Sequence, residues 1–89
     1  MSILNDYVAN IEETCGEERH FIVMLRFNKR NEAMKKILER GKIEKSFSGL
    51  VYEISFKGVR MRLYKTGKIL LKNLNERKEV EKILEELLK

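Results

Sequence analysis

The spacing of apolar residues along the chain switches between two periods and so divides the chain into short elements. Apolar side chains recur three or four residues apart in residues 2–14, 30–40 and 76–88, the spacing of a helix with one buried face. In residues 19–27, and again from 42 to 74, they alternate with other residues, as in half-buried strands. The pattern predicts helix, strand, helix, four strands and a closing helix.

Capping residues and glycines give the expected ends of the helices. Ser2 is a candidate N-cap for the first helix, and Gly16 follows that helix as a stop. Asn28 and Asn75 are predicted to cap the second and third helices, and Gly41 to end the second.

Glycine-containing turns divide the alternating region into four predicted strands, 42–47, 50–57, 59–65 and 68–74. Short strands joined by such turns form an antiparallel meander, in which Gly67 is expected to have a positive φ. The sequence thus predicts an α+β fold: one curved antiparallel sheet of about five strands, with helices on its convex face. Residues 1–17 would form an N-terminal helical extension, and 18–89 a single domain.

Alternation also predicts which side chains face the helices. In the first strand, Phe21, Val23, Leu25 and Phe27 share one face. In the last two strands the more uniformly apolar sides, Val59, Met61, Leu63, Ile69 and Leu71, are assigned to the core. The residues left pointing away from the helices are Arg60, Arg62, Tyr64, Leu70 and Lys72, joined by Lys45 or Phe47.

Composition limits the functions that such a domain could have. The 89 residues are 43% hydrophobic and 37% charged, with a net charge of +5, which suits either an anionic partner or an ordinary lysine-rich surface. The abundance of Lys, Glu and Arg, without glutamine, favours a heat-adapted source. We see no apolar run of membrane-spanning length and no signal-peptide pattern, so we expect a cytoplasmic protein.

The chain has few of the cysteine and histidine side chains that catalytic and metal sites commonly use. Its single cysteine, Cys15, and single histidine, His20, exclude an internal disulfide and a cysteine- or histidine-based metal site or triad. We therefore expect a protein that is not an enzyme and needs no cofactor or metal. What remains is the outward face, where cations interleave with an aromatic ring, a pattern suited to phosphates and bases. Ordinary solvated side chains are the alternative interpretation.

Two segments at a fixed separation resemble one repeat of the TATA-box-binding protein (TBP). Residues 47–52, Phe-Ser-Gly-Leu-Val-Tyr, are similar to its Phe-Pro-Gly-Leu-Val/Ile-Tyr motif. Residues 63–69, Leu-Tyr-Lys-Thr-Gly-Lys-Ile, are similar to the second motif of the repeat, and the element order from about Arg19 to Lys89 also matches. Residues 64–68 further resemble the TBP-like N-terminal domain of bacterial type-three ribonuclease H.

This resemblance implies half of a saddle whose concave face lies on duplex DNA or an RNA–DNA hybrid. Phe47 and Tyr64 would occupy the positions of the two groove-inserting phenylalanines. Arg60, Arg62 and Lys72 would contact phosphates, and Leu70 would add groove contact. Arg62, Leu70 and Lys72 replace smaller or apolar residues of the family, and Glu53 replaces a phosphate-binding arginine, so recognition of a specific TATA sequence is not expected.

The chain holds one repeat where the TATA-box-binding protein has two. It would therefore act as a homodimer or alone, as the ribonuclease domain does. An alternative interpretation is a protein-interaction or self-association module that keeps the fold and has lost nucleic-acid binding. A small-ligand pocket between sheet and helices is a third interpretation, although the apolar stripes of the helices are largely needed for packing.

Overall fold

The computed structural model of the chain describes residues 3–14, 20–72, 74 and 76–89. In chain order the elements are α1 (Ile3–Tyr7), β1 (Val8–Glu13), β2 (His20–Leu25), the 3-10 helix η1 (Phe27–Lys29), α2 (Arg30–Arg40), β3 (Lys42–Phe47), β4 (Val51–Phe56), β5 (Val59–Tyr64), β6 (Lys68–Lys72) and α3 (Arg77–Leu88).

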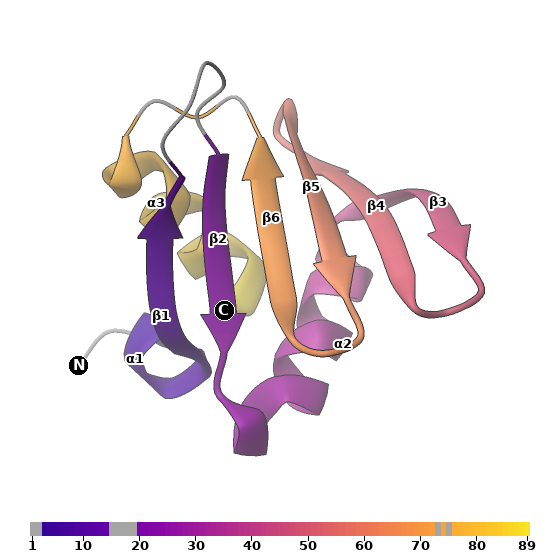
Figure 1. Cartoon of the computed structure of the whole chain (residues 1–89), viewed down its shortest axis with the longest axis horizontal. Coiled ribbons are helices and arrows are strands. Elements are labelled where there is room, and N and C mark those ends of the chain that lie inside the picture. Colours follow the sequence, from indigo (N-terminus) through magenta and orange to yellow (C-terminus); the bar gives the residue numbers. More distant parts are fainter. Residues whose placement is uncertain (1–2, 15–19, 73, 75) are drawn as a thin grey trace.

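All six strands belong to one antiparallel sheet in the order β1-β2-β6-β5-β4-β3, shown in Figure 1. The predicted α+β class with an antiparallel sheet is confirmed. The predicted strand count of about five is wrong by one, because β1 adds a strand beside β2. The strands β3 to β6 are joined in sequence by short turns, so this half of the sheet is a meander.

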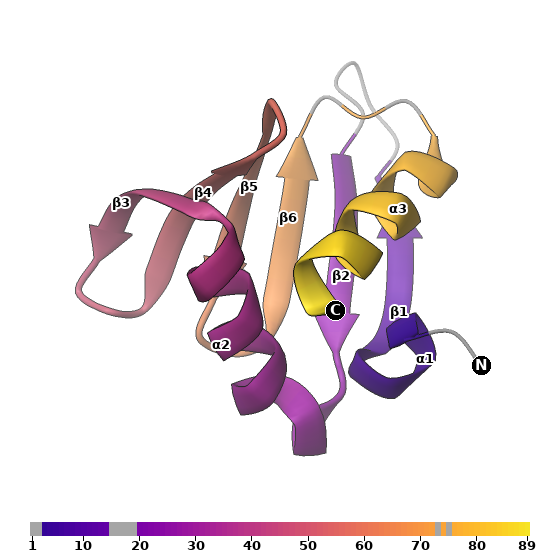
Figure 2. The same cartoon turned by 180° about the vertical axis from the view of Figure 1, so that it is seen from behind.

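The helices lie together on one side of the sheet, as Figure 2 shows. The sheet residues that point to this side, such as Phe21, Val23, Leu63 and Ile69, are buried. They pack with the apolar stripe of α3, which includes Val80, Leu84, Leu87 and Leu88, and with Ala33 and Ile37 of α2. The core is therefore a single layer between the sheet and the helices.

The predicted helix over 2–14 is wrong beyond Tyr7, where the chain becomes strand β1. The pairing of β1 with β2 shifts by one residue between Val8 and Asn10, which marks a β-bulge. Val8 pairs with Leu25 and Ile11 with Val23, two residues whose side chains enter the core. Because of the bulge, Val8 and Ile11 serve the same face of the strand although they are three residues apart. Residues on one face of a helix have the same spacing.

Three smaller predictions are also wrong. Asn28 does not cap α2, because it lies inside η1 and the N-cap position belongs to Lys29, with no side-chain cap. The pattern places Phe27 on one face of a buried strand with Phe21, but Phe27 lies beyond β2 and is 83% exposed. The strand predicted over 68–74 ends at Lys72, and Leu74 beyond it is buried.

Other predicted end residues lie outside the described part of the chain or are placed as expected. Ser2, Cys15, Gly16 and Asn75 are not among the described residues. Gly67 has φ +96°, as predicted for its turn. Gly41 ends α2 with an extended backbone, and a Cβ there would overlap Cγ2 of Ile54. None of the helices in the described residues is long and apolar enough to cross a membrane.

Candidate nucleic-acid interface

The face of the sheet turned away from the helices, here called the open face, is the surface directed at the viewer in Figure 1. Cross-strand partners in an antiparallel sheet lie on the same face, so the register identifies the members of this face. All six predicted site residues belong to it: Phe47, Arg60, Arg62, Tyr64, Leu70 and Lys72. Lys45 also belongs to it, opposite Glu53.

Two cations lie next to each other on β5 and β6. Met61 pairs with Leu71, so the flanking residues Arg60 and Lys72 are neighbours across the two strands on the open face. Like charges in such positions repel each other, and an anion placed between them relieves the repulsion. Neither side chain forms an ion pair with another residue of the described ranges. We call Arg60 and Lys72 the basic pair.

Arg62, by contrast, is held by a carboxylate. It lies directly opposite Glu53 on β4, and its Nη2 and Nε lie 3.0 Å and 3.1 Å from the same oxygen, Oε1 of Glu53. Hydrogen bonds to Tyr64 and to Glu53 and the negative charge of Glu53 raise the pKa of Arg62. A phosphate that approaches Arg62 must therefore compete with Glu53.

The aromatic residues Phe47 and Tyr64 lie in one row across the sheet. Val51 of β4 pairs with Phe47 on one side and with Tyr64 on the other, so the two rings are two strands apart. Phe47 is 48% exposed, and Leu50 in the adjoining turn is 57% exposed. The ammonium of Lys68 lies 5.6 Å from the centroid of the Tyr64 ring. We call Phe47 and Tyr64 the aromatic row.

A polar hollow of about 420 Å³ lies on the same face. It is lined by Lys45, Glu53, Arg60, Arg62 and Lys72, among others, so cations outnumber carboxylates around it. Glu44 lies at a β-bulge on its border, where it accepts a hydrogen bond from Oγ of Ser55 at 2.9 Å. The hollow therefore offers cationic donors to an anionic ligand.

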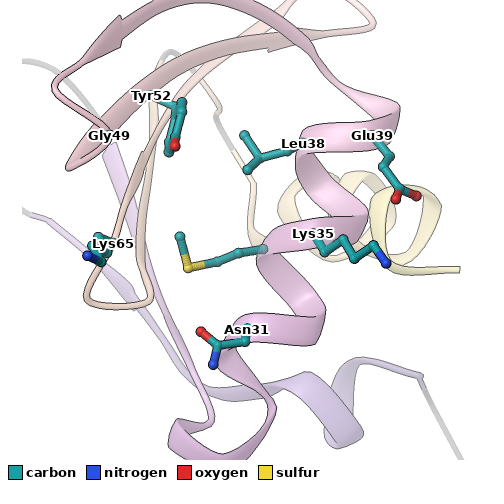
Figure 3. Close-up of a pocket in the computed structure, with 8 residues that line it drawn as sticks. Asn31, Lys35, Leu38, Glu39, Gly49, Tyr52 and Lys65 are labelled. Carbon is teal, nitrogen blue, oxygen red and sulfur yellow. The ribbon is translucent and has the colours of Figure 1, made fainter.

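A second recess of about 430 Å³ lies on the other side of the sheet, between α2 and the start of β4. In Figure 3, Leu38 points toward Tyr52, whereas Lys35 and Glu39 point away from the space between α2 and the sheet. The lining surface is mostly apolar, and its charged residues, Lys35, Glu39 and Lys65, are of mixed sign. Within the described residues, no three His, Cys, Asp or Glu side chains are grouped so that they could hold a metal ion.

Some features of the site are not evident in the sequence pattern. Alternation alone does not assign the faces of residues 50–57. The register places Tyr52, Ile54 and Phe56 toward the helices and Val51, Glu53 and Ser55 on the open face. The ion pair of Arg62 follows from this register. The only sign of this ion pair in the sequence is that Glu53 stands where the family that the chain resembles has an arginine.

No protein-family model, curated protein or solved structure matches the chain.

Proposed function

We propose that this protein is a non-catalytic nucleic-acid-binding domain that uses its open face, mostly through contacts to the sugar–phosphate backbone. In this proposal the open face is the concave side of a TBP-like half-saddle. Duplex DNA and RNA–DNA hybrid are the partners that the sequence resemblance favours. The basic pair, Arg60 and Lys72, is the observation that carries the proposal, because two adjacent cations with no ion-pair partner among the described residues form a site for a phosphate.

The surroundings of the basic pair support the same proposal. Lys45 and Arg62 add positive charge around the hollow, so more than one phosphate can be neutralised. The aromatic row lies two strand positions beyond Arg62 and offers ring faces for stacking. These groups come from β3, β5 and β6, which the sheet holds in fixed register.

The test is fluorescence anisotropy with labelled duplex DNA and RNA–DNA hybrid at two salt concentrations. We expect micromolar or tighter binding that weakens steeply with salt, because each neutralised phosphate contributes about 0.9 to the slope of log K against log salt. The double variant Arg62→Ala/Lys72→Ala should bind more weakly and with a shallower salt slope, without unfolding.

The matched control is Lys35→Ala/Lys78→Ala, which removes the same charge from exposed positions on α2 and α3. If binding depended only on net charge, both double variants would lose the same affinity. Equal losses, or unchanged binding by Arg62→Ala/Lys72→Ala, would contradict the proposed face.

Self-association or docking of another protein is the second candidate, and one observation favours it. Strand β3 is an edge strand that is exposed along its whole length, and Ile43, Phe47 and Leu50 expose apolar surface on or beside it. Light scattering separates the two candidates. A tight dimer that is weakened by Ile43→Lys and does not bind nucleic acid would favour self-association.

A further inference from the structure

We infer that the open face binds an unpaired nucleic-acid strand in preference to a double helix. This inference rests on the proposed function and narrows its ligand, replacing the duplex or hybrid that the resemblance favours. It follows from how three groups are arranged along β5: a cation of the basic pair at Arg60, the ion-paired Arg62, and Tyr64 of the aromatic row.

At the two ends of this arrangement, Arg60 suits the phosphate of a nucleotide and Tyr64 suits a base. Arg60 and Tyr64 are four residues apart on β5, which at about 3.3 Å per residue is about 13 Å. At the 3.4 Å rise of a stacked strand this distance spans about four nucleotides, and a more extended strand covers it with fewer. A strand that runs along β5 can thus place a phosphate at the basic pair and bases at the aromatic row.

The middle of the face disfavours a double helix. Arg62 and Glu53 stand opposite each other between the basic pair and the aromatic row, and their side chains are 40% and 29% exposed. A sheet pressed onto a groove floor would cover this ion pair and remove its water, which is costly for both charges. The carboxylate of Glu53 would also lie near the dense phosphate charge of a duplex. A flexible single strand can pass this point without covering it.

The aromatic row also favours bases that are already unpaired. Insertion of a side chain into a duplex must unstack a base step, which is unfavourable. Splayed bases of a single strand stack on rings without this cost. Lys68 over the Tyr64 ring does not prevent this, because base stacking on an aromatic ring is the stronger of the two interactions.

The exposed apolar surface beside the aromatic row extends the same platform. Phe47 is half exposed, Leu50 more so, and Val51 lies between the two rings. Base faces are apolar and cover such a surface, whereas the outside of a double helix presents phosphates to it. The row is therefore suited to more than one base.

The experiment compares fluorescein-labelled 12-nucleotide probes of one sequence: single-stranded DNA, single-stranded RNA, duplex DNA and the hybrid, all at the same salt. At 3.4 Å per stacked nucleotide the probe, about 41 Å, is longer than the 33 Å longest extent of the protein. We expect at least one single strand to bind ten-fold or more tightly than the duplex and the hybrid.

Tyr64→Ala tests the stacking role. We expect it to weaken single-strand binding by about five-fold or more, and by a larger factor than it weakens duplex binding. Phe27→Ala is the matched control, since it removes an exposed aromatic ring outside the sheet. If Tyr64→Ala does not fold, Tyr64→Leu carries the test, because it keeps an apolar side chain while it loses the ring and its hydroxyl.

The possible outcomes separate this inference from the proposed function. Duplex or hybrid binding equal to or tighter than single-strand binding overturns the inference and leaves the proposed function standing. An unchanged single-strand affinity in the folded Tyr64 variants also overturns the inference alone. A lack of binding to all four probes at low salt overturns both.

Discussion

At the scale of single residues, the Glu53–Arg62 pair decides how much positive charge the open face offers. Its two nitrogen–oxygen contacts of 3.0 Å and 3.1 Å hold the guanidinium on a carboxylate that lies on the same face. The basic pair has no such partner within the described residues. Under the proposed function Glu53 therefore weakens binding, by competing with phosphate for Arg62.

Glu53→Gln tests this competition. The variant removes the negative charge and releases Arg62, so we expect affinity for nucleic acid to rise about two- to five-fold and the salt slope to steepen by about one. The measurement is anisotropy at several salt concentrations.

The control for this variant is Glu81→Gln on α3, where Glu81 pairs with Arg77 at 3.3 Å. It makes the same change in net charge and also releases an arginine, but on a helix. Affinity that rises equally in both variants, or not at all in Glu53→Gln, would contradict a specific role for Glu53.

At the scale of elements, the contact between the end of α2 and β4 depends on a glycine. Gly41 has φ −80° and ψ 160°, a backbone that any residue can adopt, so its role is to leave space. A Cβ there would overlap Cγ2 of Ile54, a buried residue of β4, and lie 3.1 Å from the carbonyl oxygen of Ile37. The backbone at Gly41, where the chain passes from α2 to β3, therefore lies close against the core residue Ile54.

Gly41→Ala is expected to destabilise the protein by about 1–3 kcal/mol, because it overpacks this contact. Ile54→Leu removes the Cγ2 methyl group of Ile54 and keeps the side-chain volume nearly constant. In the double variant the loss should therefore be smaller than the sum of the two single losses. Urea unfolding of the four proteins measures this coupling, and simple additivity would show that Ile54 is not the obstacle.

Also at the scale of elements, the sequence predicted the second half of the chain better than the first. The predicted strands over 42–74 agree closely with β3 to β6 because glycine turns separate them and alternation runs through each one. The N-terminal prediction failed because the bulge in β1 lets Val8 and Ile11 serve one face at a spacing of three. Local spacing cannot distinguish that arrangement from a helix.

At the scale of the whole molecule, the N-terminal segment is part of the sheet and the core. Strand β1 pairs along β2, and Leu4, Tyr7 and Val8 are buried in the core cluster. Burial of one such side chain contributes about 1.5–3 kcal/mol, so the three together contribute roughly 5 kcal/mol or more. That is comparable to the whole stability of a small domain, about 5–15 kcal/mol.

Deletion of residues 1–14 is therefore expected to leave a chain that is largely unfolded at 25 °C. Circular dichroism and urea unfolding measure the effect. Ala9→Ser, an exposed position in the same strand, is the control and should stay close to the parent protein. A truncated chain that unfolds cooperatively at nearly the parent urea midpoint would show that residues 1–14 are an independent extension.

The sequence by itself determined the features that depend on neighbours along the chain. Turns, helix stripes and strand alternation are local, so α2, α3, the meander and the open face with its six candidate residues could all be predicted. Tertiary structure decided the features that depend on pairing between distant segments. Three such features follow from the register, which the whole sheet fixes: the place of β1 beside β2, the neighbouring cross-strand positions of Arg60 and Lys72, and the ion pair of Arg62 with Glu53.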